Sequence, residues 1–310
     1  MMTSEELNAH IADGSINEVI RVAEAKQVKA LSRIADEVCE QSRVRLVLVT
    51  GASAAGKTTT AKRICTQLLV NGRSAALHLS TDDYFVGDDR TPRAENGELD
   101  YEHVECVDIV RLVADINALC QGEAVPVRRF DFATHVPYVT AELRTLPADG
   151  IVVLEGIHAL NPRLTEGVPE EAKYRVYVEP KPSLDVLGGI VPKPSETRFL
   201  RRIVRDNQFR KLPPARTVRL WPNVLAGEKK WIEPYRERAN WTFDSYLVYE
   251  LAVLKPYVGG LLERVRLELG EIPEVMNMIR LLAAVEIAPS DLVPGDSILR
   301  ETIGGSQLEY

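Results

Sequence analysis

Short apolar runs alternate along the chain with stretches of helical periodicity. The runs have the length and β-branched content of buried strands, and they predict strands over residues 45–50, 75–80, 125–132, 150–154 and 173–178. Apolar residues at helical spacing predict helices over residues 15–43, 59–70, 104–120, 196–210, 231–242, 250–269 and 274–285. Strands that alternate with helices are typical of a mostly parallel sheet with helices on both faces. We therefore expect an α/β three-layer sandwich with extra N- and C-terminal helices.

The same pattern suggests three parts of the chain. Residues 1–44 form an N-terminal helical extension, residues 45–270 a central domain, and residues 271–310 a C-terminal helix and tail that pack on it. Residues 86–100 are charged and contain Gly and Pro, which predicts a mobile loop. Residues 180–195 hold four prolines and a Gly-Gly pair, as expected of a connecting loop.

Composition narrows the possible partners. The net charge of −7 provides no basic field for nucleic acid or an anionic membrane. No apolar stretch approaches the ~20 residues that a membrane-spanning helix needs. Residues 1–13 lack the basic-then-apolar layout of a secretory signal. The four cysteines are scattered without a Cys-x-x-Cys pair, so we expect reduced thiols in a cytoplasmic protein.

A complete phosphate-binding loop follows the first predicted strand. Its two glycines, Gly51 and Gly56, let successive backbone amides point at an anion, and the next helix adds its positive N-terminal end. Lys57 can reach the β- and γ-phosphates, and the Thr58 hydroxyl can ligate Mg²⁺. The loop predicts a nucleoside triphosphate site and a P-loop NTPase fold. The residues predicted to bind ATP are Gly51, Ala52, Ser53, Ala54, Ala55, Gly56, Lys57, Thr58 and Thr59.

Two predicted strands end in acidic residues, Asp82 and Glu155. The carboxyl ends of parallel strands meet beside the phosphate loop, where phosphoryl transfer to an alcohol needs a base and a metal. We assign Asp82 as the base and Glu155 as a Mg²⁺ ligand, and these two roles are open to exchange or sharing, so Asp82 is also a candidate metal ligand. The alternative for an acid at this position is a turn cap, which suits the neighbouring Asp83 at least as well.

Arginines form a stripe along the predicted helix at 196–210. Arg198, Arg201, Arg202 and Arg205 recur at i, i+3, i+4 and i+7, which places them on one helix face. Like charges at this spacing repel unless an anion lies between them. We expect a lid around residues 196–212 whose arginines close on the phosphates, with Arg210 one turn further on. The alternative is a solvated charged surface.

These residues belong to motifs that resemble the phosphoribulokinase and uridine kinase family of P-loop kinases. The resemblance runs from about residue 45 to at least 250. It rests on Gly51 to Thr59, Ser80-Thr81-Asp82-Asp83-Tyr84-Phe85, Phe130-Asp131-Phe132-Ala133-Thr134-His135, Glu155-Gly156-Ile157, Arg201-Arg202-Ile203-Val204-Arg205-Asp206 and Trp231-Ile232-Glu233-Pro234. The kinase half of longer bacterial nucleoside kinases is most similar, and it shares the stretches Thr217 to Pro222, Tyr249 to Leu251, Ser297 to Glu301 and Gly304-Gly305-Ser306.

The resemblance implies ATP with Mg²⁺ as donor and a primary alcohol of a nucleoside or sugar as acceptor. It implies Asp82 as base, metal contacts at Thr58 and Glu155, and catalytic or phosphate contacts at Lys57, Arg202, Arg205 and Arg210. The acceptor-binding residues implied are Asp82, Tyr84, Glu102, Phe130, His135 and Arg202. His135 is equally open to interpretation as an ordinary loop histidine.

Three positions depart from the family pattern. Phe130 stands where a tyrosine is usual, Leu212 replaces an arginine, and Glu102 is longer than the usual aspartate. A site that loses polar contacts can prefer another acceptor.

The leading hypothesis is a kinase for a uridine- or cytidine-like nucleoside. The first alternative is the same chemistry on a sugar, sugar phosphate, polyol or pantothenate-like alcohol. The second is a nucleotide-switched regulatory NTPase, although the guanine-reading Asn-Lys-x-Asp motif is absent from the sequence. A third possibility, compatible with catalysis, assigns helices 15–43 and 250–285 to assembly of a homo-oligomer.

Overall fold

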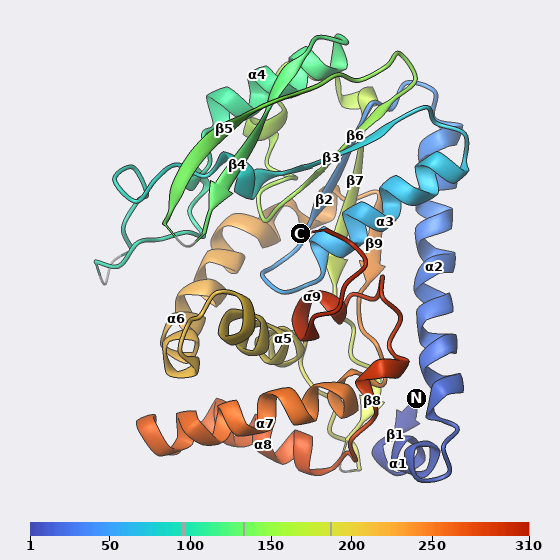
Figure 1. Ribbon diagram of the computed structural model, residues 1–310, viewed down its shortest axis with the longest axis vertical. Coiled ribbons are helices and arrows are strands. Elements are labelled where there is room, and N and C mark those ends of the chain that lie inside the picture. Colours follow the sequence, from blue (N-terminus) through green and yellow to red (C-terminus); the bar gives the residue numbers. More distant parts are fainter. Residues whose placement is uncertain (95–96, 133, 187, 310) are drawn as a thin grey trace.

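The computed structural model describes residues 1–94, 97–132, 134–186 and 188–309. Parts of four predicted features lie outside it: residues 95–96 of the loop at 86–100, Ala133 of the motif at 130–135, residue 187 of the segment 180–195, and Tyr310 of the tail. A five-stranded parallel sheet forms the centre (Figure 1). Its order is β3 (Ala76–Ser80), β6 (Ile151–Glu155), β2 (Leu46–Thr50), β7 (Lys173–Glu179) and β9 (Trp241–Asp244).

Successive side chains of strand β2 point to opposite faces of the sheet, and both faces are buried because an apolar cluster covers each. Leu46 and Leu48 pack into the cluster that contains α4 (Ile109–Cys120). Val47 and Val49 pack into the cluster on the other face, which contains α2 (Ile16–Glu40) and α3 (Lys57–Val70). The predicted three-layer α/β architecture is confirmed.

A third apolar cluster joins the N-terminal segment to the C-terminal helices. Its elements are α1 (Ser4–Ala12), α5 (Pro194–Phe209), α6 (Pro214–Gly227), α7 (Glu250–Leu269), α8 (Pro273–Ala283) and α9 (Arg300–Ile303). Strand β1 (Met2–Thr3) pairs with β8 (Leu184–Asp185), and the Asn8 side chain bonds the backbone of Ala284 and Glu286. Within the described residues, no helix combines the length and apolarity of a membrane span.

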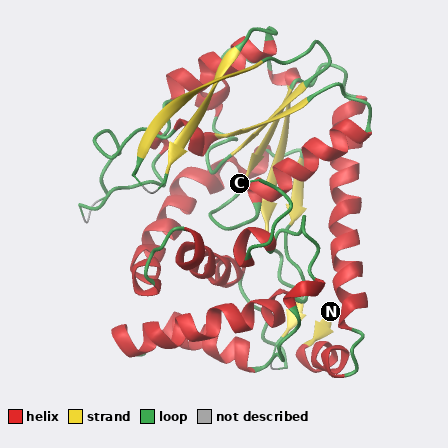
Figure 2. Ribbon diagram, viewed as in Figure 1, coloured by secondary structure: helices red, strands yellow, loops and turns green. Residues whose placement is uncertain are grey.

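An antiparallel hairpin stands apart from the central sheet (Figure 2). It pairs the predicted β4 (Val125–Asp131) with β5 (Val136–Arg144), a strand that the sequence did not indicate because its residues are largely exposed. The described residues of the segment 86–100 form turns and an isolated bridge between Arg93 and Leu99.

The prediction of a helix over 231–242 is wrong. The chain there forms a π-helix at Glu228–Ile232 and a 3₁₀-helix at Glu233–Arg238, and then enters β9 at the sheet edge. Phe243 of β9 is fully buried in the sheet core, so packing against β7 determines the conformation. The sequence also missed α1 and α6, whereas the helices predicted at 15–43, 59–70, 104–120, 196–210, 250–269 and 274–285 are present with adjusted ends.

Candidate active site

The phosphate loop connects β2 to α3 and is held against the edge of β7. A Cβ atom on Gly51 would lie 2.2 Å from the carbonyl oxygen of Val178, so only glycine fits this approach. Gly56 has φ of 91° and is the N-cap of α3, a left-handed conformation that favours glycine. The Lys57 ammonium donates to the carbonyl of Ala52 at 3.1 Å and thus folds back over the loop.

Glu155 lies at the end of β6, where it is buried and accepts two hydroxyl hydrogen bonds. Thr58 Oγ1 donates to Glu155 Oε1 at 3.2 Å, and Ser80 Oγ donates to the same oxygen at 2.7 Å. Burial, with a further contribution from the Asp82 carboxylate, raises the pKa of Glu155 to about 7. Mg²⁺ binds to few protein oxygens when it also binds phosphates, so the hydroxyl and carboxylate at this position fit that ion.

Asp82 follows β3 in the short 3₁₀-helix Thr81–Tyr84, near enough to Glu155 for its charge to act on that carboxyl. Burial lowers the pKa of the Lys57 ammonium, while the carboxylates of Glu155 and Asp82 oppose that change. Ser80 Oγ caps this turn by accepting the Asp82 amide hydrogen bond at 3.3 Å. Asp82 is therefore not the cap of the turn. Asp83 instead forms an ion pair with Arg129 at 3.0 Å.

Tyr84 does not join this group. Its side chain is 5% exposed, and its hydroxyl donates to Asp115 of α4 at 3.1 Å. The prediction that Tyr84 binds the acceptor is corrected on this point: the ring packs in the core below β3 and its polar end is already occupied.

The arginine stripe of α5 divides into two functional halves. Arg198 and Arg201 are buried, with 3% and 1% exposure, and form ion pairs with Glu228 at 2.6 Å and Glu250 at 2.5 Å. Both also donate toward loop carbonyls, Arg198 to Ser53 at 3.3 Å and Arg201 to Ala54 and Ala55 at 3.5 Å. The alternative of a solvated charged surface is therefore wrong for this pair, because both arginines are buried and paired with acids. Their hydrogen bonds to the loop carbonyls connect α5 to the phosphate loop.

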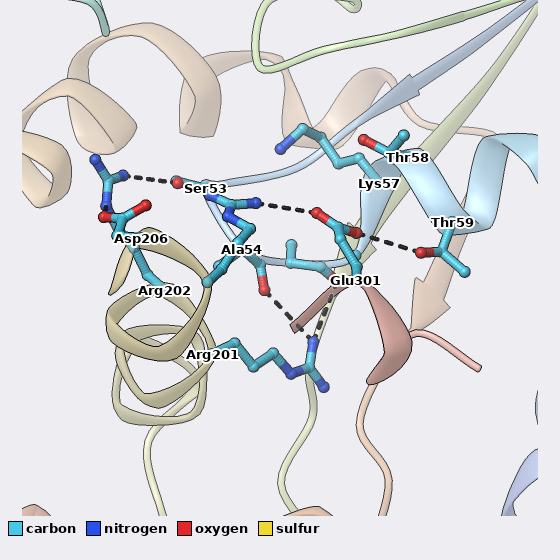
Figure 3. Close-up of polar contacts among 12 residues, drawn as sticks. Ser53, Ala54, Lys57, Thr58, Thr59, Arg201, Arg202, Asp206 and Glu301 are labelled. Carbon is cyan, nitrogen blue, oxygen red and sulfur yellow. Dashed lines mark hydrogen bonds and ion pairs between the residues drawn. The ribbon is translucent and has the colours of Figure 1, made fainter. Parts of the chain in front are cut away.

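Arg202 and Arg210 lie at the loop and share one buried acid. Arg202 Nη1 donates to Ser53 Oγ at 2.7 Å, and its Nε lies 3.3 Å from Asp206 (Figure 3). Arg210 is 3.6 Å from Asp206, and its guanidinium lies over the Phe132 ring of the hairpin at 5.2 Å. Burial, with repulsion from the Arg205 charge, lowers the pKa of Arg210 to about 10.

Arg205 and Thr59 converge on a residue that sequence reasoning did not assign, Glu301 of α9. Glu301 accepts from Arg205 Nη1 at 3.0 Å and from Thr59 Oγ1 at 3.2 Å. Figure 3 shows Glu301 on the opposite side of the loop from Arg202. The family resemblance includes the stretch Ser297 to Glu301 but implies no role for it. The sequence therefore marked this stretch, but it did not show that Glu301 lies beside the phosphate loop.

Glu102 faces Arg202 across the site. The nearest oxygen–nitrogen distance is 3.7 Å, and both side chains are 12% exposed. Burial raises the pKa of Glu102, against the effect of the Arg202 charge. Glu102 Oε2 is buried and has no hydrogen-bond partner among the described residues, which leaves an unpaired acceptor next to Arg202.

His135 belongs to a polar and aromatic group at the turn of the hairpin, between β4 and β5. Its backbone has φ of 57°, unusual for a residue other than glycine, and its Nδ1 lies 2.8 Å from Tyr101 Oη and 3.0 Å from Asp88 Oδ1. The Phe130 ring centroid lies 6.3 Å from the His135 ring and 5.2 Å from that of Phe132. Sequence reasoning missed Asp88, which lies in the segment 86–100 that was predicted as a loop, and Tyr101, which directly follows it.

Comparisons with known proteins identify the family of this chain. The model of a family described as "Phosphoribulokinase / Uridine kinase family" matches residues 46–246. The chain belongs to the phosphoribulokinase/uridine kinase family. It is therefore an ATP-dependent small-molecule kinase.

Individual relatives agree with this membership. A uridine kinase of Deinococcus deserti is 28% identical over 193 residues, which covers 62% of this chain and 83% of the relative. A uridine kinase of Lactobacillus johnsonii is 28% identical over 171 residues, which covers 55% and 72%. The crystal structure of a putative fructose transport system kinase from Silicibacter sp. TM1040 is similar, with a TM-score of 0.50 and 20% identity over 68% of this chain and 98% of that one. At this identity the last likeness concerns the fold alone.

Proposed function

We propose that this kinase transfers the γ-phosphate of ATP, as its Mg²⁺ complex, to a primary hydroxyl of a uridine- or cytidine-like nucleoside. The observation that carries the acceptor class is the unpartnered Glu102 oxygen. Glu102 directly follows Tyr101 in the chain, and the Tyr101 ring contacts His135, which in turn lies near Phe130. A carboxylate suits the hydroxyls of a ribose, and flat rings suit a base. Glu102 faces Arg202, and the Phe132 ring lies under Arg210, which shares Asp206 with Arg202.

The donor half of the proposal uses the residues around the loop. Residues 51–59 would hold the triphosphate, with Lys57 at the β- and γ-phosphates. Thr58 and Glu155 would hold Mg²⁺, which neutralises charge on the phosphates when bound. Arg202, Arg205 and Arg210 would clamp the phosphates from the lid, and residues 45–270 would form the kinase domain.

Asp82 is proposed as the base that accepts the proton of the attacking hydroxyl. Its position supports this role because the Asp82 charge acts on both Lys57 and Arg210, the cations proposed to contact the phosphates, and a carboxylate near the phosphates can accept the proton of the hydroxyl. Glu155 differs because it already accepts hydrogen bonds from Thr58 and Ser80. The division of roles therefore assigns Asp82 to the proton and Glu155 to the metal.

On the acceptor side, Glu102 would bind ribose hydroxyls and His135 would reach a base edge. His135 Nδ1 is held by Tyr101 and Asp88, which leaves Nε2 for a ligand. Phe130 would pack against the base. Phe130 lacks the hydroxyl of the usual tyrosine, and a site that loses a polar contact can prefer another acceptor, so a sugar or polyol is the second candidate.

A screen for acceptor-stimulated ADP release tests the proposal. Nucleosides, sugars, sugar phosphates and polyols are each added to the protein with ATP and Mg²⁺, and Lys57→Ala serves as the inactive control. We expect stimulation by uridine or cytidine, reduced strongly by Glu102→Gln. Stimulation by a sugar or polyol but by no nucleoside would show that the acceptor class is wrong, and slow hydrolysis unaffected by every alcohol would favour a regulatory NTPase.

A further inference from the structure

The C-terminal segment around α9 is packed against the phosphate loop. Ile298 is 2% exposed and belongs to the same apolar cluster as Ala55 and Ala61. A Cβ atom on Gly56 would lie 2.7 Å from Ile298 Cγ2, so the loop and the tail are in direct contact. The tail therefore forms one wall of the site around α3.

The tail keeps this position without help from Glu301. The Arg300 guanidinium donates to the carbonyls of Ser290 at 3.0 Å, Val293 at 2.5 Å, and Pro294 and Gly304 at 3.3 Å. Leu299 is fully buried in the helical cluster, next to the buried Ile298. These contacts fix the fold of the segment, so the Glu301 side chain is not required as an anchor.

The Glu301 carboxylate instead connects α5 to the first turn of α3. It accepts from Thr59 Oγ1 at 3.2 Å (Figure 3). It also accepts from Arg205 Nη1 at 3.0 Å, and both members of this ion pair are 15% exposed. Arg205 Nε is buried and has no hydrogen-bond partner among the described residues. The contact with Glu301 is therefore the main constraint on the direction of this guanidinium.

We propose that Glu301 is a positioning residue of the nucleotide site, which holds the Arg205 guanidinium and the Thr59 hydroxyl in the orientation that meets the phosphates of ATP. A free arginine side chain loses considerable rotamer entropy when it is fixed, and a preformed contact removes that cost from binding. Thr58 and Thr59 then serve opposite sides of the loop, since Thr58 bonds Glu155 and Thr59 bonds Glu301. This inference rests on the phosphate role proposed for Arg205.

A double-mutant cycle on ATP binding tests it without any acceptor. Titration calorimetry with ATP and Mg²⁺ would compare the wild type, Glu301→Ala, Glu301→Gln, Arg205→Ala and the double variant Glu301→Ala with Arg205→Ala. We expect Glu301→Ala to weaken binding roughly tenfold, as for loss of one charged hydrogen bond. Glu301→Gln keeps an acceptor oxygen for Arg205 and should recover part of the loss. In the Arg205→Ala background, Glu301→Ala should weaken binding by less than about twofold.

A matched control removes another carboxylate of the tail. Asp291 is exposed, so Asp291→Asn should leave ATP binding and the melting temperature unchanged. Equal weakening by Glu301→Ala with and without Arg205, or no weakening in either background, would overturn the positioning role. The failure of every acceptor in the ADP-release screen, with the ATP-binding cycle as expected, would instead overturn the proposed function and leave the inference standing.

Discussion

The buried ion pair beneath the phosphate loop provides the strongest stability prediction. Glu250 has 0% and Arg201 1% exposure, and Arg201 donates to Glu250 Oε2 from Nη2 at 2.5 Å and from Nε at 3.2 Å. Glu250→Gln removes the negative charge and leaves the guanidinium buried without a counterion. Breaking one partner of a buried pair costs about 3–5 kcal/mol. We expect the free energy of unfolding to fall by about that amount.

Urea unfolding followed by circular dichroism measures the loss. The control is Glu263→Gln, since Glu263 and Arg266 have the same 2.5 Å contact but are 48% and 37% exposed. An exposed pair of this kind contributes at most about 1 kcal/mol. If Glu250→Gln cost no more than Glu263→Gln, burial would not be the source of the energy, and the reasoning would be refuted.

The double variant Arg201→Met with Glu250→Leu separates charge from packing. Removing both charges from a buried pair is often neutral for stability. We therefore expect the double variant to recover most of the free energy that Glu250→Gln loses. The contacts from Arg201 to the Ala54 and Ala55 carbonyls are lost as well, so ATP binding should stay weaker than in the wild type.

Four further predictions concern catalysis and pH. Lys57→Ala should lower kcat by about 10²–10³, as expected for loss of a transition-state charge contact, and steady-state ADP release measures it. Asp82→Asn should lower kcat by about 10²–10⁴ with ATP affinity nearly unchanged, and a near-normal kcat would exclude Asp82 as the base. Arg202→Ala should slow transfer and weaken ATP binding, and unchanged kinetics would argue against a phosphate contact. Burial lowers the pKa of His158 from 6.5 to about 4, so the unfolded chain gains a proton first as the pH falls. The contribution of His158 to stability should therefore drop between about pH 6.5 and 4, by about 2 kcal/mol at about pH 5, and His158→Leu should lose that much less stability than the wild type between about pH 7 and 5 in urea unfolding.

Local sequence patterns were sufficient to predict the helices and strands that contain a continuous apolar run. The strand at 45–50 and the helix after Gly56 were evident because the apolar spacing and the glycine loop occur within one short stretch. Strand β9 was missed because four residues carry little periodicity and the pairing with β7 supplies the missing information. Strand β5 was missed for a related reason, since it is mostly exposed and pairs only with β4.

In the candidate site, too, local sequence patterns could not show which side chains from distant segments come into contact. Helical spacing correctly placed the arginines of α5 on one face, but it could not show that Arg198 and Arg201 meet buried acids from distant segments. Tyr84 was assigned from its motif, while its hydroxyl direction depends on Asp115 in the next helix. Glu301 contacts a residue 242 positions away in sequence, a distance at which spacing carries no information.

The contact between the tail and the phosphate loop has a consequence for biosynthesis. Thr59 leaves the ribosome long before Glu301, because 242 residues separate them in the chain. Strand β2 also cannot form its hydrogen bonds to β6 and β7 until those strands have been translated, roughly a hundred residues later. The nucleotide-binding loop thus acquires its full set of neighbours only near the end of synthesis. A chain that ends before Ile298 would contain the complete phosphate-loop sequence, but the loop would lack its contact with the C-terminal tail.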